Sequence, residues 1–421
     1  MRPMGAVTWG RAGTHLDLAL VSSYASLLKT PGVARLIAAQ LTARFPFGML
    51  SLAFLIHIER IFNSYGAAGL VLAAMSIGQA IAGPLTSRLM GRLGMRPVIL
   101  VTMIVCATSV IVMAVVPMGV VGLMLVGFLA GLSMPPIQPA VRTIYPKVVN
   151  SRQLSPLFAL DASAQEIIWV LGPVIATFVA IQVSTVAGIL LAAAFLIGGS
   201  IWCLLLPEVG RVRIPRSRRK LGVVLKKPAV LLSTVVGFML VAACAAVEAG
   251  VVAVFGHGSA DSGWVLGIFA IGSLIGGLAL GHRPIGPWAL AARMLIVAAG
   301  LVLATFWLTF WWLAVALLLA GIGIAPAFAV LFGIVSASVK FSDTAEAYGW
   351  VGTGQLMGAA MGSAVAGFSI DHSGPVSAIF VAAGFAGLGC IIAALARRHA
   401  PDLRGRDVSP IPDTEPIGVV S

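Results

Sequence analysis

Long blocks of apolar residues dominate the chain, and short polar stretches separate them. Several blocks run for about 18 residues or more, which lets an α-helix cross a bilayer core of ~30 Å. The pattern predicts an all-α membrane protein with twelve transmembrane helices. We expect them at residues 34–58, 65–90, 97–117, 119–143, 156–181, 184–206, 229–255, 262–282, 288–307, 309–337, 346–370 and 375–396.

An internal repeat spans about half the chain length. A shift of 194 residues places 69–83 on 263–277, with identical residues at Gly69/Gly263, Val71/Val265, Leu72/Leu266, Ile77/Ile271, Gly78/Gly272, Ile81/Ile275 and Gly83/Gly277. A second echo places Leu129-Ala-Gly131 on Leu319-Ala-Gly321. The alternative is chance similarity between helices rich in Gly, Ala and Ile. The repeat predicts two pseudo-symmetric six-helix bundles.

Composition excludes an ordinary soluble protein. The chain is 59% hydrophobic and 10% charged, whereas soluble domains carry about 25% charged residues. The net charge of +13 would suggest nucleic acid in a soluble chain. Here the basic residues lie between the apolar blocks, so we expect the lipid bilayer, and no nucleic acid, as the partner. The four cysteines are far apart within predicted spans, which favours packing over disulfides or metal binding.

Lysines and arginines lie almost entirely on one side of the predicted membrane. Outside the long linker, the residues counted on that side are Arg88, Arg92, Arg96, Arg142, Lys147, Arg152, Arg283, Lys340, Arg397 and Arg398. The other side has only Arg60, next to Glu59. The positive-inside rule therefore predicts a multi-pass cell-membrane protein with both termini in the cytoplasm.

The same pattern divides the chain into five parts. A cytoplasmic segment (1–31) precedes the N-terminal bundle (32–206), a basic linker (207–228) and the C-terminal bundle (229–397). The linker either binds an anionic lipid surface or is a solvated, topology-setting connection. The final segment (398–421) is rich in proline and glycine, which favours a disordered cytoplasmic tail.

The loop after the first repeat copy carries a family resemblance. Its sequence, Gly91-Arg-Leu-Gly-Met-Arg-Pro97, resembles the D-R-x-G-x-R-P core between helices 2 and 3 of the major facilitator superfamily. Gly91 stands where the family has an acid, and Ser87 where it has an earlier glycine. The resemblance implies two bundles that rock around a midplane site. It also implies a cytoplasmic gate at Arg88, Gly91, Arg92, Gly94 and Arg96.

A second motif resembles the antiporters of this superfamily. Gly172-Pro173 matches the start of the G-P-x-x-G signature of span 5, although Ala176 replaces its second glycine. Small residues and proline allow close packing and a bend. The arginine that the family has in the middle of span 4 is absent between Gly127 and Pro139, so the usual relay of drug antiporters is incomplete here.

Charged residues within predicted spans are few, and each costs roughly 2.5–3.5 kcal/mol at mid-helix. Arg44 follows Gln40 by one helical turn and precedes Pro46, which favours a kink. The superfamily places span 1 beside span 5, so we expect Arg44 to find a partner there, with Glu166 at a similar depth. This pair is either a static ion pair or a site where substrate or proton competes for one partner.

Two further acids are proton-site candidates together with Glu166. Asp161 either contacts Arg142 or Lys147 at the gate or is a simple helix-start carboxylate. Glu248 has no nearby cation in sequence, and an apolar setting favours the protonated form of a carboxyl. It is either a proton site or a carboxyl exposed to water at the outer mouth. The candidates to line a substrate cavity are Arg44, Gln40, Gln138, Gln165 and Gln355, although each glutamine is also a plausible interhelical hydrogen-bonding group.

These features predict a secondary transporter. The sequence has no P-loop, nucleophile motif or Cys/His cluster, so we expect no catalytic residue, cofactor or metal site. A largely uncharged cavity with isolated acids favours proton-coupled efflux of a small apolar or cationic compound by a monomer. One alternative is an uptake permease for an organic acid or sugar with Arg44 as counter-charge. Another is a membrane sensor or scaffold that does not transport.

Overall fold

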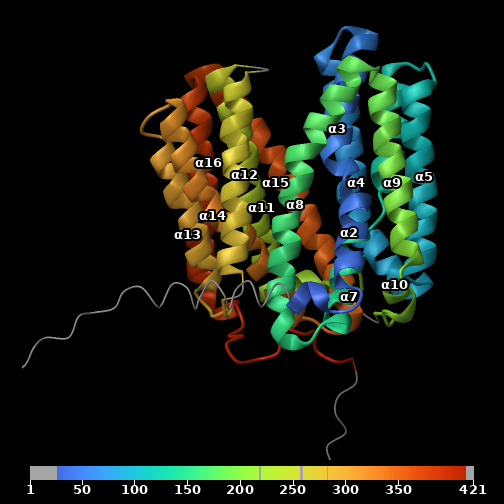
Figure 1. Cartoon of the computed structure of the whole chain (residues 1–421), viewed down its shortest axis with the longest axis vertical. Helices are drawn as coiled ribbons and strands as arrows, with labels where there is room; N and C mark the ends of the chain where they lie inside the picture. Colours follow the sequence, from blue (N-terminus) through green and yellow to red (C-terminus); the bar gives the residue numbers. More distant parts are fainter. Residues whose placement is uncertain (1–25, 218–219, 257–258, 282, 414–421) are drawn as a thin grey trace, which may run out of the picture.

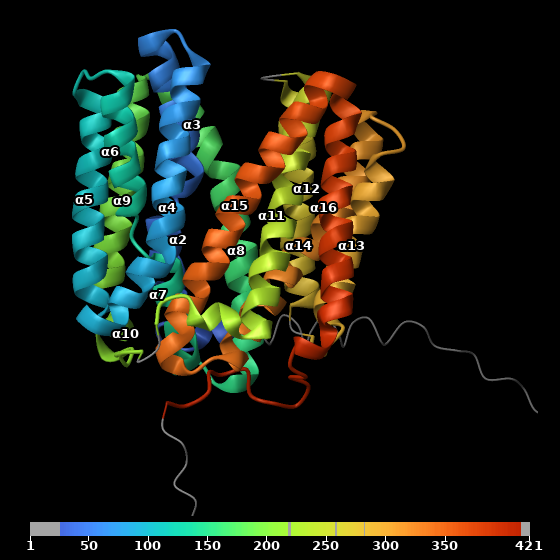
Figure 2. The same cartoon turned by 180° about the vertical axis from the view of Figure 1, so that it is seen from behind.

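The computed structural model describes residues 26–217, 220–256, 259–281 and 283–413, and its elements are helices arranged in two bundles (Figures 1 and 2). The N-terminal bundle holds α2 (Val33–Arg44), α3 (Pro46–Phe62), α4 (Tyr65–Leu93), α5 (Met95–Val115), α6 (Val120–Leu132), α7 (Ile137–Val148), α8 (Ser151–Gln182) and α9 (Thr185–Leu205). The C-terminal bundle holds α11 (Pro228–Phe255), α12 (Ala260–Leu280), α13 (Ala289–Ala304), α14 (Phe310–Ser338), α15 (Phe341–Ser373) and α16 (Pro375–Leu395).

These helices form twelve spans, because α2 with α3 and α6 with α7 each make one interrupted span. Ten spans are long and apolar enough to cross a membrane, and α13 is a shorter apolar helix. The twelfth span, α15, is 33 residues long and begins with a polar turn that contains Asp343. The predicted fold class is confirmed.

Proline causes both interruptions. Arg44 ends α2 and Pro46 begins α3, as expected from the missing amide hydrogen and the bulk of the ring. In the fourth span, α6 ends at Leu132 and α7 begins after Pro135 and Pro136. Each break places a short helix (α2 or α7) at the membrane side where the connection between the bundles lies.

The repeat is visible in how helices pack. In the first copy, a Cβ on Gly78 of α4 would lie 2.8 Å from the amide nitrogen of Leu132 in α6. In the second copy, a Cβ on the equivalent Gly272 of α12 would lie 3.2 Å from Cα of Gly321 in α14. Equivalent glycines therefore bring equivalent backbones together, which confirms two homologous bundles.

We call the membrane side that holds the connection the linker side. This connection contains α10 (Pro207–Arg211) and η1 (Val223–Lys226). The bundles touch where α4 crosses α15 and where α8 crosses α12. They diverge toward the opposite side of the membrane (Figures 1 and 2).

The C-terminal segment differs from the prediction of disorder. After η2 (Ala396–His399), residues 400–413 pack along the linker side. Leu403 and Val408 are buried, and the Leu403 amide donates to the Ile285 carbonyl at 2.8 Å. Ile411 forms a parallel bridge with Lys340. Apolar residues spaced through this proline-rich segment pack against the bundle. The prediction of disorder, which used composition alone, is therefore wrong for these residues. Residues 1–25 of the predicted N-terminal segment and 414–421 of the tail lie outside the described residues.

Candidate functional site

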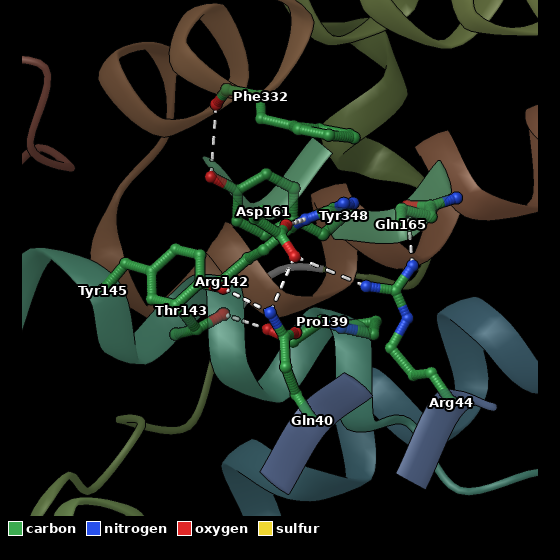
Figure 3. A network of polar contacts seen from close by, with 10 residues as sticks. All are labelled: Gln40, Arg44, Pro139, Arg142, Thr143, Tyr145, Asp161, Gln165, Phe332 and Tyr348. Carbon is green, nitrogen blue, oxygen red and sulfur yellow. Dashed lines mark hydrogen bonds and ion pairs between the residues drawn. The ribbon is translucent and has the colours of Figure 1, made fainter. Parts of the chain in front are cut away.

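A buried ion-pair network lies in the N-terminal bundle, with Asp161 of α8 at its centre (Figure 3). Asp161 Oδ2 accepts a hydrogen bond from Arg142 Nε of α7 at 2.7 Å, and Arg44 Nη1 of α2 lies 3.4 Å from Oδ1. Gln40 Nε2 donates to Oδ1 at 2.7 Å. One fully buried carboxylate thus compensates two guanidinium groups, and this ionic network is held by charge-assisted hydrogen bonds.

The two proline breaks bring the cations to this carboxylate. Arg44 is the last residue of α2, and Gln40 precedes it by one turn on the same face. Arg142 lies in α7, the short helix after the Pro135-Pro136 break. In straight helices without these breaks, the Arg44 and Arg142 side chains would point in other directions and would not meet at Asp161.

Further polar groups surround the network. Arg44 Nη2 donates to Gln165 Oε1 at 2.6 Å, and Gln40 Nε2 donates to the Tyr145 hydroxyl at 2.7 Å. When the Gln138 amide is oriented with its oxygen toward Arg142, this oxygen accepts from both terminal nitrogens of the guanidinium, at 2.8 Å for Nη2. The predicted cavity residues Gln40, Gln138 and Gln165 therefore serve the ion pairs.

The prediction that Arg44 pairs with Glu166 is wrong, although its partners do lie on the same helix, α8. Arg44 pairs with Asp161 and Gln165, which lie one turn apart on the same face of α8. Glu166 is the next residue and lies about 100° further round the helix, so it faces elsewhere. The predicted contact of Asp161 with Arg142 is confirmed, while Lys147 Nζ lies over the Phe341 ring, 4.6 Å from its centroid.

Aromatic side chains connect the network to the C-terminal bundle. Arg142 stacks on the ring of Phe332 in α14, with 3.4 Å from its Cζ to the ring centroid. The Tyr348 hydroxyl of α15 donates to the Phe332 carbonyl at 3.1 Å (Figure 3). Phe158 of α8 packs against both rings, at centroid distances of 6.3 and 6.4 Å. This cation–π and aromatic cluster closes the linker side between the bundles.

A second polar constellation joins the two bundles directly. Glu166 Oε1 of α8 accepts a hydrogen bond from Ser273 Oγ of α12 at 2.9 Å. Glu248 of α11 is exposed and lies within electrostatic reach of Glu166. Cys244, one turn before Glu248, lies within reach of both carboxyls. Within the described part of the chain, neither Glu166 nor Glu248 forms an ion pair.

Ser273 and Cys244 are not among the site residues predicted from the sequence. Ser273 occupies the position equivalent to Gln79 when the two repeat copies are superposed by 194 residues. Each copy therefore carries a polar residue at this position within an apolar span, which could have marked Ser273 from the sequence. Cys244 precedes Glu248 by four residues, which places both on one helix face. The described residues contain no group of three His, Cys, Asp or Glu side chains arranged to hold a metal ion.

Comparison with known proteins identifies the family. The family model of the Major Facilitator Superfamily matches residues 36–308 and 253–415. The chain belongs to the major facilitator superfamily. The human organic anion transporter MFSD10 (TETRAN) is similar in structure, with a TM-score of 0.65 and 16% identity over 86% of this chain and 100% of that chain.

A variant of the E. coli fucose:proton symporter FucP is also similar, with a TM-score of 0.67 and 14% identity over 86% of this chain and 98% of that chain. At these identities the likeness shows a shared fold. No curated protein matched the chain in sequence. Membership identifies a secondary transporter of small molecules rather than an enzyme.

The superfamily motif after α4 lies where the bundles meet the linker. Arg88 Nη1 pairs with Glu346 Oε2 of α15 at 3.0 Å, and Glu346 Oε1 accepts from the Gly222 amide of the linker at 2.8 Å. Gly91 replaces the family acid, and a Cβ there would lie 3.2 Å from the Pro215 carbonyl. The acid that joins the bundles here is thus Glu346, which sequence analysis missed because it begins a span.

The remaining motif residues have structural contacts. Gly94 links α4 to α5 with a φ of +91°, and Arg96 Nη2 lies 3.4 Å from the Leu206 carbonyl. Arg92 lines a basic surface groove beside the linker. In the antiporter-like motif, Gly172 lets α8 approach α3, since a Cβ there would lie 2.8 Å from Gly48 Cα, and α8 continues as a helix through Pro173. Gln355 lies against α11, apart from the Asp161 network.

Proposed function

We propose that this transporter exchanges protons for a small apolar or cationic compound and exports it, with Glu166 and Glu248 as the shared site. The observation that carries the proposal is the position of two acids, one from each bundle, within electrostatic reach of each other and with no ion-pair partner among the described residues. In this fold the substrate site lies between the bundles near the bilayer midplane. Glu166 belongs to α8, which packs against α12 and α14 of the other bundle, and Glu248 of α11 lies within electrostatic reach of Glu166.

Electrostatics explains how this pair can exchange ligands. Two carboxylates within electrostatic reach repel each other when both are ionised, and a bound proton removes the repulsion. A cationic compound removes it equally well. Proton and substrate then compete for one site, so loading of one releases the other.

The hydrogen bond between Glu166 and Ser273 supports a link from protonation to bundle movement. It joins α8 to α12 across the interface at 2.9 Å. An ionised carboxylate accepts a stronger hydrogen bond than a protonated one. A change of charge on Glu166 therefore alters the relative free energies of two bundle arrangements, which is what alternating access requires.

The geometry of Arg44 argues against the alternative of organic-acid uptake. Its side chain is 5% exposed and is already occupied by Asp161 and Gln165. An anionic substrate would have to displace a buried carboxylate that also holds Arg142, which costs several kcal/mol by analogy with other buried ion pairs (~3–5 kcal/mol). Loss of the family acid at Gly91 would favour a scaffold that does not transport, but the pair of Arg88 with Glu346 supplies an inter-bundle gate contact without that acid.

We further propose that the protein lies in the cell membrane and that its linker side faces the cytoplasm. Arg88, Arg92, Arg96 and Lys147 all lie near that side, and the positive-inside rule orients such a side inward. The side toward which the bundles diverge then faces outward, and we propose that Glu166 and Glu248 take up protons from there. An accessibility assay with a tag at the C-terminus tests this orientation in intact cells.

Proton release on substrate binding tests the function. Addition of tetraphenylphosphonium, a small lipophilic cation, to purified protein in weakly buffered solution is expected to release protons. Glu166→Gln and Glu248→Gln each remove one titrating group, so each is expected to abolish most of this signal. Asp371→Asn, which changes an exposed acid at the end of α15, serves as the matched control and retains it. Binding without proton release, or binding of benzoate that is lost in Arg44→Ala, contradicts the proposal.

Alkylation of Cys244 provides an independent prediction. This thiol lies within electrostatic reach of both carboxyls. Bound tetraphenylphosphonium is therefore expected to slow its modification by N-ethylmaleimide, as followed by peptide mass spectrometry. Cys390, which contacts the Ala291 carbonyl on α13, is the internal control and reacts at an unchanged rate. Equal protection of both thiols would indicate a general change in the protein rather than occupation of the site.

A further inference from the structure

A basic groove lies on the linker side of the C-terminal bundle, apart from the carboxyl site. It is formed by the start of α13, η2 and the packed C-terminal segment, and its volume is about 680 Å³. Its charged and aromatic lining residues are Trp288, Arg293, Arg397, Arg398, Asp402 and Arg404. Four guanidinium groups thus face a single carboxylate.

The cations of this groove are poorly compensated. Asp402 is bonded to Arg404, at 2.7 Å to Nη2 and 2.9 Å to Nε, and this bonding lowers the pKa of Asp402 to about 2. Arg293, Arg397 and Arg398 form no ion pair with any described residue.

Arg293 has a buried donor that lacks an acceptor within the described part of the chain. Its Nε is buried and has no hydrogen-bond partner among the described residues, and Arg283 adds a like charge nearby. A buried donor without an acceptor costs about 1–3 kcal/mol, and an acceptor from outside the chain would remove this cost.

The position of the groove indicates where that acceptor comes from. Trp288 is 54% exposed at the start of α13, and the Arg397 guanidinium stacks on its ring with 4.2 Å from Cζ to the centroid. Leu295, two turns further along α13, is 58% exposed on the surface of the bundle. A tryptophan and arginines at the end of a span, next to an exposed apolar helix face, are typical of the headgroup level of a bilayer.

We propose that this groove binds the phosphate of an anionic phospholipid headgroup. Guanidinium groups suit phosphate because they present parallel donors to two oxygens. Arg293 belongs to the bundle and Arg404 to the C-terminal segment. One phosphate between them fixes the C-terminal segment against α13. The bound lipid therefore stabilises the packed form of the C-terminal segment.

Native mass spectrometry of the full-length protein in detergent tests the proposal. Phosphatidylglycerol is expected to remain bound at a low lipid-to-protein ratio, while phosphatidylcholine does not. The double variant Arg293→Gln/Arg397→Gln is expected to weaken phosphatidylglycerol binding by about tenfold or more, since each arginine near an anionic surface contributes about 1 kcal/mol. Arg406→Gln, which removes an exposed cation of the same segment outside the groove, leaves binding unchanged.

A displacement measurement and a second variant identify the source of the phosphate and control for misfolding. Soluble glycerol 3-phosphate at millimolar concentration is expected not to displace the lipid, and full displacement would overturn the lipid as the source of the phosphate. If the double variant does not fold, Arg397→Gln/Arg398→Gln changes only η2 and is expected to give the same loss. Equal phosphatidylglycerol binding by wild type, groove variants and the Arg406 control would overturn the proposal.

Discussion

Asp161→Asn is expected to destabilise the folded protein by about 3–5 kcal/mol, the cost of removing one partner from a buried ion pair. The carboxylate is fully buried, and among the described residues it is the acid that pairs with both Arg44 and Arg142. An asparagine keeps the shape but leaves both guanidinium groups without a counter-charge. Thermal unfolding of the detergent-solubilised protein, followed by circular dichroism, measures the loss.

Two variants control this prediction. Asp371→Asn removes an exposed acid and is expected to leave the unfolding midpoint unchanged. Asp161→Asn combined with Arg142→Gln removes one of the two stranded cations, so part of the stability is expected to return. A midpoint for Asp161→Asn equal to that of the wild type would mean that water or lipid already compensates these arginines, and the network would then not be a structural one.

Gly349→Leu is expected to prevent closure of the linker side and to abolish transport. A Cβ on Gly349 of α15 would lie 2.6 Å from the Gly83 carbonyl oxygen and 2.9 Å from Ser87 Oγ of α4. A side chain at Gly349 would overlap the α4 backbone, which cannot move aside locally, so the two bundles must separate at this contact. The arrangement with the linker side open then becomes the favoured one.

Distances between spin labels measure this shift. Labels at Leu93, the end of α4, and Leu395, the end of α16, are on exposed positions of the two bundles. Their distance is expected to increase in Gly349→Leu. Gly352→Leu is the matched control, because it lies on the same helix and a Cβ there meets nothing within 4 Å. An unchanged label distance in Gly349→Leu, together with normal transport, would show that α4 and α15 accommodate the leucine without separating, and would contradict the prediction.

Most of the architecture could be read from the sequence. Apolar blocks marked the spans, and the identity of Gly78 with Gly272 marked two bundles whose helices pack equivalently. The motif beginning at Gly91 marked the family, which the match to the superfamily model confirms. Pro46 marked the break that ends α2 at Arg44.

The candidate site could be predicted only in part. Arg44, Asp161 and Glu166 stood out because charges are rare in spans, but their partners did not follow from spacing. Asp161 and Gln165 share one face of α8 and Glu166 has another, and only tertiary packing decides which face meets α2 and which meets α12. The packed C-terminal segment depends likewise on contacts with Ile285 and Val339, far away in sequence.

The sequence by itself therefore determined the helices, their number and their pairing into two halves. The physical reason is that a chain in lipid must satisfy its backbone hydrogen bonds within each segment, so local hydrophobicity identifies the spans. The tertiary structure decided the rotation of each helix and hence the partner of each charge. Rotation depends on side-chain packing between helices that lie far apart in the chain, and no local pattern records it.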